Sequence, residues 1–230
     1  MIRALLFDMF DTLADAHRSM EQAECDALGV TPEQWGSAMW EEKLTYDRGI
    51  GNIASVREMI DRACENLPVR ATPEQRCAAE RARCERLRMA MTDMHPMIIE
   101  TVRELKETGL KLGLVSNADV CDRMYWTESP VYPFFDDAIF SCDVRLLKPD
   151  ARIYGLSLER LGVRADEAVF IGDGGSGELS GAKALGMKTV CTEFLRVHDA
   201  SERAAIHACA DFVLRRFDEL PGVIEKLNAQ

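Results

Sequence analysis

Residues 1–15 read MIRALLFDMFDTLAD, and this stretch decides the fold. The short apolar run Ala4–Phe7 ends abruptly at Asp8, and Thr12 follows four residues later. A buried strand that delivers a carboxylate to its C-terminal end, followed by a tight polar turn, is typical of α/β proteins that present a nucleophile or a metal ligand. The alternative is a core strand that simply ends in a solvated aspartate, and the rest of the chain decides between the two.

Composition and charge exclude several classes of protein. The 230 residues suffice for one large domain, or for one domain that carries a sizeable insertion. A net charge of −11 argues against a nucleic-acid partner. No apolar run reaches the length of a membrane span, and no secretory signal precedes the first strand. We therefore expect a cytoplasmic protein, monomeric or homodimeric, that binds neither nucleic acid nor a membrane.

The pattern of apolar residues divides the chain into two parts. Residues 16–94 contain no convincing strand and read as a small bundle of about four helices, broken at glycines and prolines. From residue 95 onward, helices and short strands alternate with short connections. This alternation predicts an α/β fold with a parallel sheet covered by helices on both faces. We expect a core of residues 1–15 and 95–230, with residues 16–94 inserted as a helical cap beside the first strand's carboxyl end.

Polar residues follow three further apolar segments of the predicted core. Ser116 follows the first segment, Lys148 the second, and Asp173 the third, in a glycine-rich turn that also contains Glu178. We interpret each of these segments as the end of a strand. Because the carboxyl ends of parallel strands meet at one edge of the sheet, these side chains should gather there with Asp8.

These residue types fit the chemistry of phosphoryl transfer. Two neighbouring carboxylates need a cation between them, and oxygen ligands favour Mg²⁺. Asp8 would attack phosphorus, Ser116 would donate a hydrogen bond to a phosphoryl oxygen, and Lys148 would supply positive charge. Taken singly, Ser116 is more often part of a turn or a helix cap, and Lys148 more often a solvated loop lysine. Their joint order and spacing favour a catalytic site.

Four segments of the core resemble the motifs of a known superfamily: FDMFDTL (7–13), VSNA (115–118), LLKPD (146–150) and GDGGSGE (172–178). They are similar to the four motifs of the haloacid dehalogenase superfamily of hydrolases, and the inserted helices match the position of that family's helical cap. The resemblance implies a Rossmann-like core, bound Mg²⁺ and, in most members, a phosphoaspartyl mechanism.

The resemblance also assigns roles to individual residues. It implies that Mg²⁺ is bound by Asp8, by the backbone carbonyl of Phe10 and by Asp173. We expect a site with three groups of residues: catalytic Asp8, Ser116 and Lys148; substrate-binding Thr12, Asn117 and Arg48; and metal-binding Asp8, Phe10, Asp173 and Glu178.

The chain departs from the family pattern at two places. Phosphatases of this family usually carry a second Asp, which protonates the leaving group, where this chain has Phe10. Asp11 stands one residue later, and a shift of one residue in a tight turn changes the direction of the side chain. Glu178 replaces the usual Asp, with a longer side chain that can still serve a metal site, through water.

These observations favour a Mg²⁺-dependent phosphatase that acts on a small, anionic phosphorylated metabolite. One alternative is an enzyme that cleaves carbon–halogen or phosphonate bonds, which the absence of a second Asp at Phe10 favours. The other is a catalytically weak binding protein. Asp173 argues against the metal-free dehalogenases, because those enzymes lack the Gly-Asp of the fourth motif. Arg48, beside a helix break in the inserted block, is our candidate for a substrate contact from the cap.

Overall fold

The computed structural model describes residues 1–15 and 22–229, and its central element is a parallel sheet of six strands in the order β3-β2-β1-β4-β5-β6. The strands are β1 (Ala4–Phe7), β2 (Lys111–Ser116), β3 (Asp137–Phe140), β4 (Ala168–Gly172), β5 (Lys188–Thr192) and β6 (Phe212–Leu214). The chain proceeds outward from β1 to β3, then returns to the other side of β1 and proceeds outward again. Such a reversal creates a crevice at the carboxyl ends of β1 and β4, where ligands bind in open α/β sheets.

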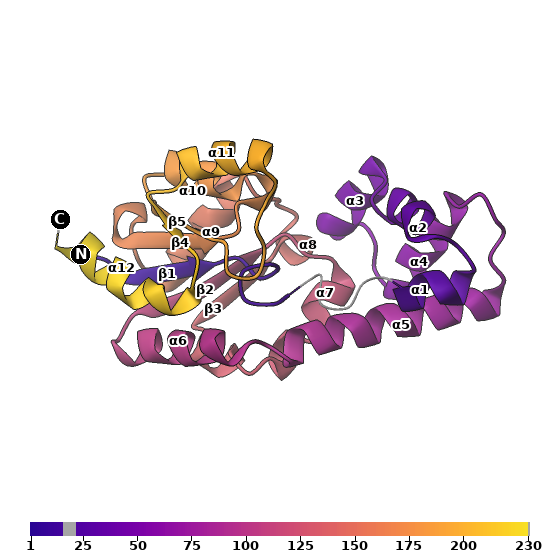
Figure 1. Ribbon diagram of the computed structural model, residues 1–230, viewed down its shortest axis with the longest axis horizontal. Helices are drawn as coiled ribbons and strands as arrows, with labels where there is room; N and C mark the ends of the chain where they lie inside the picture. Colours follow the sequence, from indigo (N-terminus) through magenta and orange to yellow (C-terminus); the bar gives the residue numbers. More distant parts are fainter. Residues whose placement is uncertain (16–21, 230) are drawn as a thin grey trace.

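Helices cover both faces of the sheet, as the alternating pattern predicts (Figure 1). One face packs against α6 (Pro96–Glu107) and α12 (Leu220–Asn228), and the cluster between them includes Phe7, Leu114 and Ile171. The other face packs against α9 (Ala151–Leu161), α10 (Glu178–Ala184) and α11 (Ala200–Cys209). Because β1 and β4 are buried on both faces, their sequences are continuously apolar.

Within its described residues, 22–94, the inserted segment forms five helices rather than about four. They are α1 (Gln22–Leu28), α2 (Pro32–Met39), α3 (Glu42–Gly49), α4 (Val56–Glu65) and α5 (Pro73–Thr92). The helices bury a hydrophobic cluster of their own around Trp35, Met59 and Ile60, beside the carboxyl edge of the sheet (Figure 1). Thr31 and Thr72 each cap a helix that has proline at its first position, as their sequences predict. The exact division at residue 94 stays a prediction.

α5 extends beyond this cluster toward the sheet (Figure 1). Leu87 packs in the cluster of the inserted helices, whereas Met91 and the following Met94 pack in the cluster under the sheet. One continuous helix therefore takes part in both hydrophobic clusters.

Three local expectations differ from the structure. Leu146 and Leu147 form no strand: they lie in the loop between the short helix α8 (Ser141–Val144) and α9. The sequence also predicts a helix over residues 118–126, but the structure has only α7 (Val120–Met124), since the Asp119 side chain caps it and delays its start. The helix α11 was not expected, because it has no fully buried residue and its apolar periodicity is weak.

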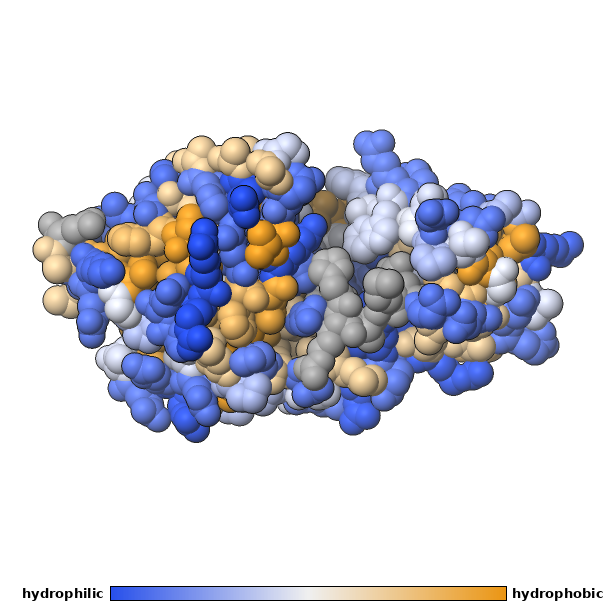
Figure 2. Space-filling model, viewed as in Figure 1, coloured by the Kyte–Doolittle hydropathy of each residue, from blue (hydrophilic) through white to orange (hydrophobic). Residues whose placement is uncertain are grey.

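On the face that Figure 2 shows, the described residues of the inserted helices are mainly hydrophilic, and larger hydrophobic areas reach the surface on the sheet-containing part. Within the part of the chain that the structure describes, we find no helix with the length and apolar character needed to cross a membrane.

Candidate active site

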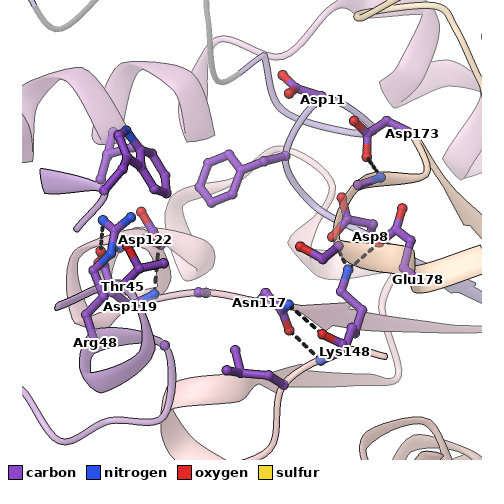
Figure 3. Close-up of a pocket in the computed structure, with 18 of the residues that line it drawn as sticks. Asp8, Asp11, Thr45, Arg48, Asn117, Asp119, Asp122, Lys148, Asp173 and Glu178 are labelled. Carbon is purple, nitrogen blue, oxygen red and sulfur yellow. Dashed lines mark hydrogen bonds and ion pairs between the residues drawn. The ribbon is translucent and has the colours of Figure 1, made fainter. Parts of the chain in front are cut away.

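Three buried carboxylates converge at the carboxyl edge of the sheet (Figure 3). Asp8 directly follows β1, Asp173 directly follows β4, and Glu178 is the first residue of α10. One oxygen from each of them lies within 4.8 Å of the other two. The sheet order explains this convergence, since β1 and β4 are paired neighbours with parallel carboxyl ends.

Lys148 lies between two of these carboxylates. Its Nζ donates to Asp8 Oδ1 at 2.5 Å and to Glu178 Oε2 at 2.5 Å, and its side chain is buried. The Asn117 side chain holds the Lys148 backbone, accepting from its N–H at 2.7 Å and donating to its carbonyl oxygen at 3.1 Å. Lys148 thus reaches the site from a loop anchored on the turn after β2, and not from a strand end.

Burial and mutual repulsion shift the ionisation of this cluster. Burial raises the pKa of Asp8, and Asp173 raises it further, against the opposing effect of Lys148. Burial and the neighbouring Asp8 raise the pKa of Glu178 to about 8. Burial alone would lower the pKa of Lys148, but its two carboxylate partners hold it above its ordinary value. Asp8 and Glu178 share one lysine and Asp173 adds a third buried acid, and such a group of oxygen ligands suits a divalent cation.

Two of the residues expected at this site, Ser116 and Thr12, carry buried hydroxyl groups. Ser116, the last residue of β2, is fully buried, and its Oγ has no hydrogen-bond partner among the described residues. Thr12 is also buried, and its Oγ1 donates to Asp8 Oδ2 at 3.4 Å. A buried hydroxyl without a partner is costly unless a ligand supplies one, so Ser116 is suited to a substrate oxygen.

Glycine is required at the end of β4. A Cβ atom on Gly172 would come within 1.9 Å of Glu178 Oε1. The Glu178 carboxylate also accepts from the backbone N–H of Gly174 at 3.0 Å, and Gly174 has a φ of +98°. The glycine-rich turn therefore lets the long Glu178 side chain fold back against the strand and reach Lys148.

A second loop, which the sequence did not single out, contacts the site from the far side of Asp173. Arg196 NH1 lies 3.1 Å from Asp11 Oδ2 and 3.6 Å from Asp173 Oδ2, and His198 Nε2 lies 3.0 Å from the same Asp173 oxygen. Asp11 has a φ of +57°, so the turn directs its carboxylate toward Arg196. The loop after β5 lacks a recognisable motif, and only the fold brings it here.

A cavity of about 1090 Å³ separates this cluster from the inserted helices. Phe10 and Asn117 contribute to its lining, and Arg48 lies at the opposite end from Asp8 (Figure 3). Arg48 NH1 donates to Asp119 Oδ2 at 3.2 Å, and its guanidinium stacks over the Trp40 ring at 4.1 Å. The expected contact between Arg48 and substrate stays a prediction, because Asp119 already holds this side chain.

Asp119 directly follows the VSNA motif after β2, and it connects the two parts of the chain. Its Oδ2 also accepts from Arg83 NH2 at 2.9 Å, so one core carboxylate binds two arginines from the inserted helices. Burial raises the pKa of Asp119, but Arg83 and Arg48 outweigh this and hold it below its ordinary value. The arginines stand 36 and 71 residues away in sequence, which no local pattern reveals.

The substitution Asp119→Asn should destabilise the protein by about 3–5 kcal/mol, because it removes the carboxylate that two buried guanidinium groups share. Asparagine still caps α7, so the helix itself should persist. Urea unfolding at pH 7 measures the loss. The exposed Asp143 is a matched control, and Asp143→Asn should change stability by less than about 1 kcal/mol. Equal effects at the two positions would contradict this role for Asp119.

Comparison with known proteins agrees with this geometry. The family model described as haloacid dehalogenase-like hydrolase matches residues 2–186. Glyceraldehyde 3-phosphate phosphatase from Methanocaldococcus jannaschii is 26% identical, over 99% of both chains. (S)-2-haloacid dehalogenase from Pseudomonas putida is 27% identical, over 74% of this chain and 75% of that protein.

Solved structures share the architecture. The L-2-haloacid dehalogenase from Xanthobacter autotrophicus, solved with chloropropionic acid covalently bound, superposes with a TM-score of 0.69 at 20% identity. The superposition covers 98% of this chain and 99% of that one. With the family model matching most of the sequence and the site built at the carboxyl edge of the sheet, the chain belongs to the haloacid dehalogenase-like hydrolases.

Proposed function

We propose that this hydrolase is a Mg²⁺-dependent phosphatase that uses Asp8 as its nucleophile. The observation that carries the proposal is the cluster of Asp8, Asp173 and Glu178, three buried carboxylates with oxygens within 4.8 Å of one another, of which Asp8 and Glu178 share a single lysine. Such an excess of buried negative charge is unfavourable unless a cation joins it, and Mg²⁺ prefers carboxylate oxygens together with a substrate phosphate. Mg²⁺ bound there would neutralise charge on the phosphoryl group.

The chain's own residues suffice for a two-step displacement. The Asp8 carboxylate attacks phosphorus, the bond from phosphorus to the leaving oxygen breaks, and an aspartyl-phosphate forms. The Lys148 ammonium and the Ser116 hydroxyl donate hydrogen bonds to the transferring group. Water then attacks the aspartyl-phosphate, which releases inorganic phosphate and restores Asp8. Phe10 has no proton to give and the Asp11 carboxylate is turned toward Arg196, so the leaving oxygen takes its proton from solvent water.

The names of the relatives support a small phosphorylated metabolite as substrate. Besides the archaeal glyceraldehyde 3-phosphate phosphatases, ribulose-1,5-bisphosphate 5-phosphatase from Halopiger xanaduensis is 30% identical over 54% of this chain. A cavity of about 1090 Å³ has room for a molecule of that size.

One observation favours carbon–halogen hydrolysis as a second candidate. The aromatic Phe10 lines the cavity at the position where phosphatases of this family carry their acid, and a halide leaves without needing a proton. The similarity to (S)-2-haloacid dehalogenases agrees with this candidate. Asp173 and Glu178 argue against it, since a pair of buried acids beside Asp8 gives a metal-free enzyme no advantage.

Mg²⁺ should stabilise the protein and activate it. At about 100 times its dissociation constant, Mg²⁺ should raise the melting temperature by about 5–10 °C. Asp173→Asn removes one ligand charge and should abolish most of this shift while the protein stays folded. The measurements are thermal unfolding and phosphate release, each with Mg²⁺ and with EDTA. Full phosphatase activity in EDTA, or chloride release from a 2-haloacid without phosphate release from any ester, would refute the proposal.

A further inference from the structure

Two polar atoms at the inserted-helix end of the cavity are buried without a partner. Arg83 is 3% exposed, and its Nε has no hydrogen-bond partner among the described residues. Thr45 Oγ1 is likewise buried and lacks a partner in the same part of the chain. Both residues line the cavity. A buried donor without a partner costs free energy, and a ligand group that accepts its hydrogen bond recovers that cost.

The two atoms belong to the same end of the cavity. Arg83 and Arg48 bind the same oxygen of Asp119, and Thr45 lies on α3 one turn before Arg48. Thr45, Arg48 and Asp119 stand together across the cavity from Asp8 and Lys148 (Figure 3). A substrate whose phosphate lies beside Asp8 would therefore direct its other end toward Thr45 and Arg83.

The charges at this end are already balanced. Arg48 and Arg83 carry two positive charges, which face the carboxylates of Asp119, at 3.2 and 2.9 Å, and of Asp122, at 3.7 Å from Arg83. Arg86, also on the cavity wall, pairs with the buried Glu24 at 2.8 Å. Among the described residues that line this end, no unpaired cation would meet a second anionic group, whereas an uncharged acceptor would leave the balance of charges intact.

We infer that Thr45 and Arg83 form a subsite for an uncharged hydroxyl or carbonyl group at the far end of the phosphorylated substrate. The Arg83 Nε–H can only donate, whereas the Thr45 hydroxyl can donate or accept, and a hydroxyl or carbonyl oxygen satisfies both. The substrate class is thus the phosphate monoesters of short polyols and hydroxycarbonyl compounds. This inference rests on the proposed phosphatase function, because the phosphate sets the orientation of the substrate.

Matched substrates test the subsite. At the end away from the phosphate, glycerol 3-phosphate presents hydroxyl groups. Propyl phosphate presents an alkyl end there, and 3-phosphoglycerate presents a carboxylate. We expect kcat/KM with Mg²⁺ to be highest for glycerol 3-phosphate, by about tenfold over propyl phosphate, the usual order for satisfying one or two hydrogen bonds. Equal values for these two would overturn the subsite, and a preference for 3-phosphoglycerate would overturn the charge argument.

Three conservative variants locate the effect. Thr45→Val removes the hydroxyl at nearly constant volume, and Thr45→Ser keeps it. Arg83→Lys keeps the charge that pairs with Asp119 but removes the Nε–H. Thr45→Val and Arg83→Lys should each reduce the ratio of kcat/KM for glycerol 3-phosphate to that for propyl phosphate several-fold, while Thr45→Ser keeps the wild-type ratio. An unchanged ratio in both Thr45→Val and Arg83→Lys would overturn the assignment.

Binding measurements separate this inference from the proposed function. Isothermal titration of Asp8→Asn with the same three esters and Mg²⁺ gives dissociation constants that need no turnover. If the wild type hydrolyses none of the esters but the dissociation constants follow the expected order, the phosphatase proposal is refuted and the subsite is retained. Hydrolysis with no order among the dissociation constants would retain the phosphatase and refute the subsite. If none of the esters binds, both proposals fail.

Discussion

Asp8→Asn should reduce kcat for phosphate ester hydrolysis on the order of 10⁴-fold or more, the usual scale for loss of a nucleophile. The amide oxygen of asparagine cannot form an acyl-phosphate, so no covalent intermediate should accumulate. Phosphate release measures the loss. Mass spectrometry of acid-quenched wild-type protein should detect phosphate on the peptide that contains Asp8, and the same peptide of Asp8→Asn should stay unmodified.

The same variant should fold normally. Because burial and Asp173 raise the pKa of Asp8, its charge opposes folding, and its removal should leave the melting temperature unchanged or raise it. Asp143→Asn, on the surface, should keep full activity. Substantial turnover by Asp8→Asn would reject the nucleophile assignment. A wild-type protein that binds Mg²⁺ but forms no phosphoenzyme would instead favour a catalytically weak binding protein.

Lys148→Met should destabilise the protein by about 3–5 kcal/mol near pH 8 in EDTA, because it leaves buried carboxylates without their cation. The loss should shrink as the pH falls. Glu178 has a folded-state pKa of about 8, above its ordinary value of 4.5, and loss of Lys148 raises it further. A carboxyl group whose pKa is raised by folding lowers the free energy of unfolding at pH values above its folded-state pKa. Protonation removes this loss as the pH falls from the folded-state pKa toward the ordinary pKa.

Urea unfolding of wild type and Lys148→Met at several pH values between 5 and 9 measures this effect. Lys183→Met is the matched control, since Lys183 lies on the surface of α10 and pairs with Asp211. Its stability should stay within about 1 kcal/mol of the wild type at every pH. Mg²⁺ should restore part of the stability of Lys148→Met without restoring activity. A loss that is independent of pH would show that packing, and not charge, explains the role of Lys148.

The sequence predicts the core of this fold well because its signals are local. The buried strands β1 and β4 are continuous apolar runs, each followed at once by an aspartate, and parallel pairing makes Asp8 and Asp173 neighbours. Lys148 was expected at the carboxyl edge of the sheet, where it lies, but for the wrong reason. It follows no strand, and Asn117 holds its loop in place instead.

The residues that sequence reasoning missed depend on contacts between distant segments. Arg83 reads as part of a solvated arginine-rich helix, yet it is buried on Asp119 once α5 packs beside α7. Arg196 lies in an irregular loop and comes within reach of Asp11 and Asp173 only through the sheet order. Neither periodicity nor motif spacing contains this information, because the partner of each arginine is set by tertiary packing.

The continuity of α5 matters for any attempt to exchange the inserted helices between relatives. Met91 and Met94 pack under the sheet, while Leu87, one turn earlier, packs with the inserted helices. In a chimera joined after residue 94, the donor would supply its inserted helices and also the two side chains at positions 91 and 94, which pack in the recipient's core. A junction between residues 87 and 91 would keep each hydrophobic cluster from a single parent, and it would preserve the helical phase that aligns Arg83 with Asp119.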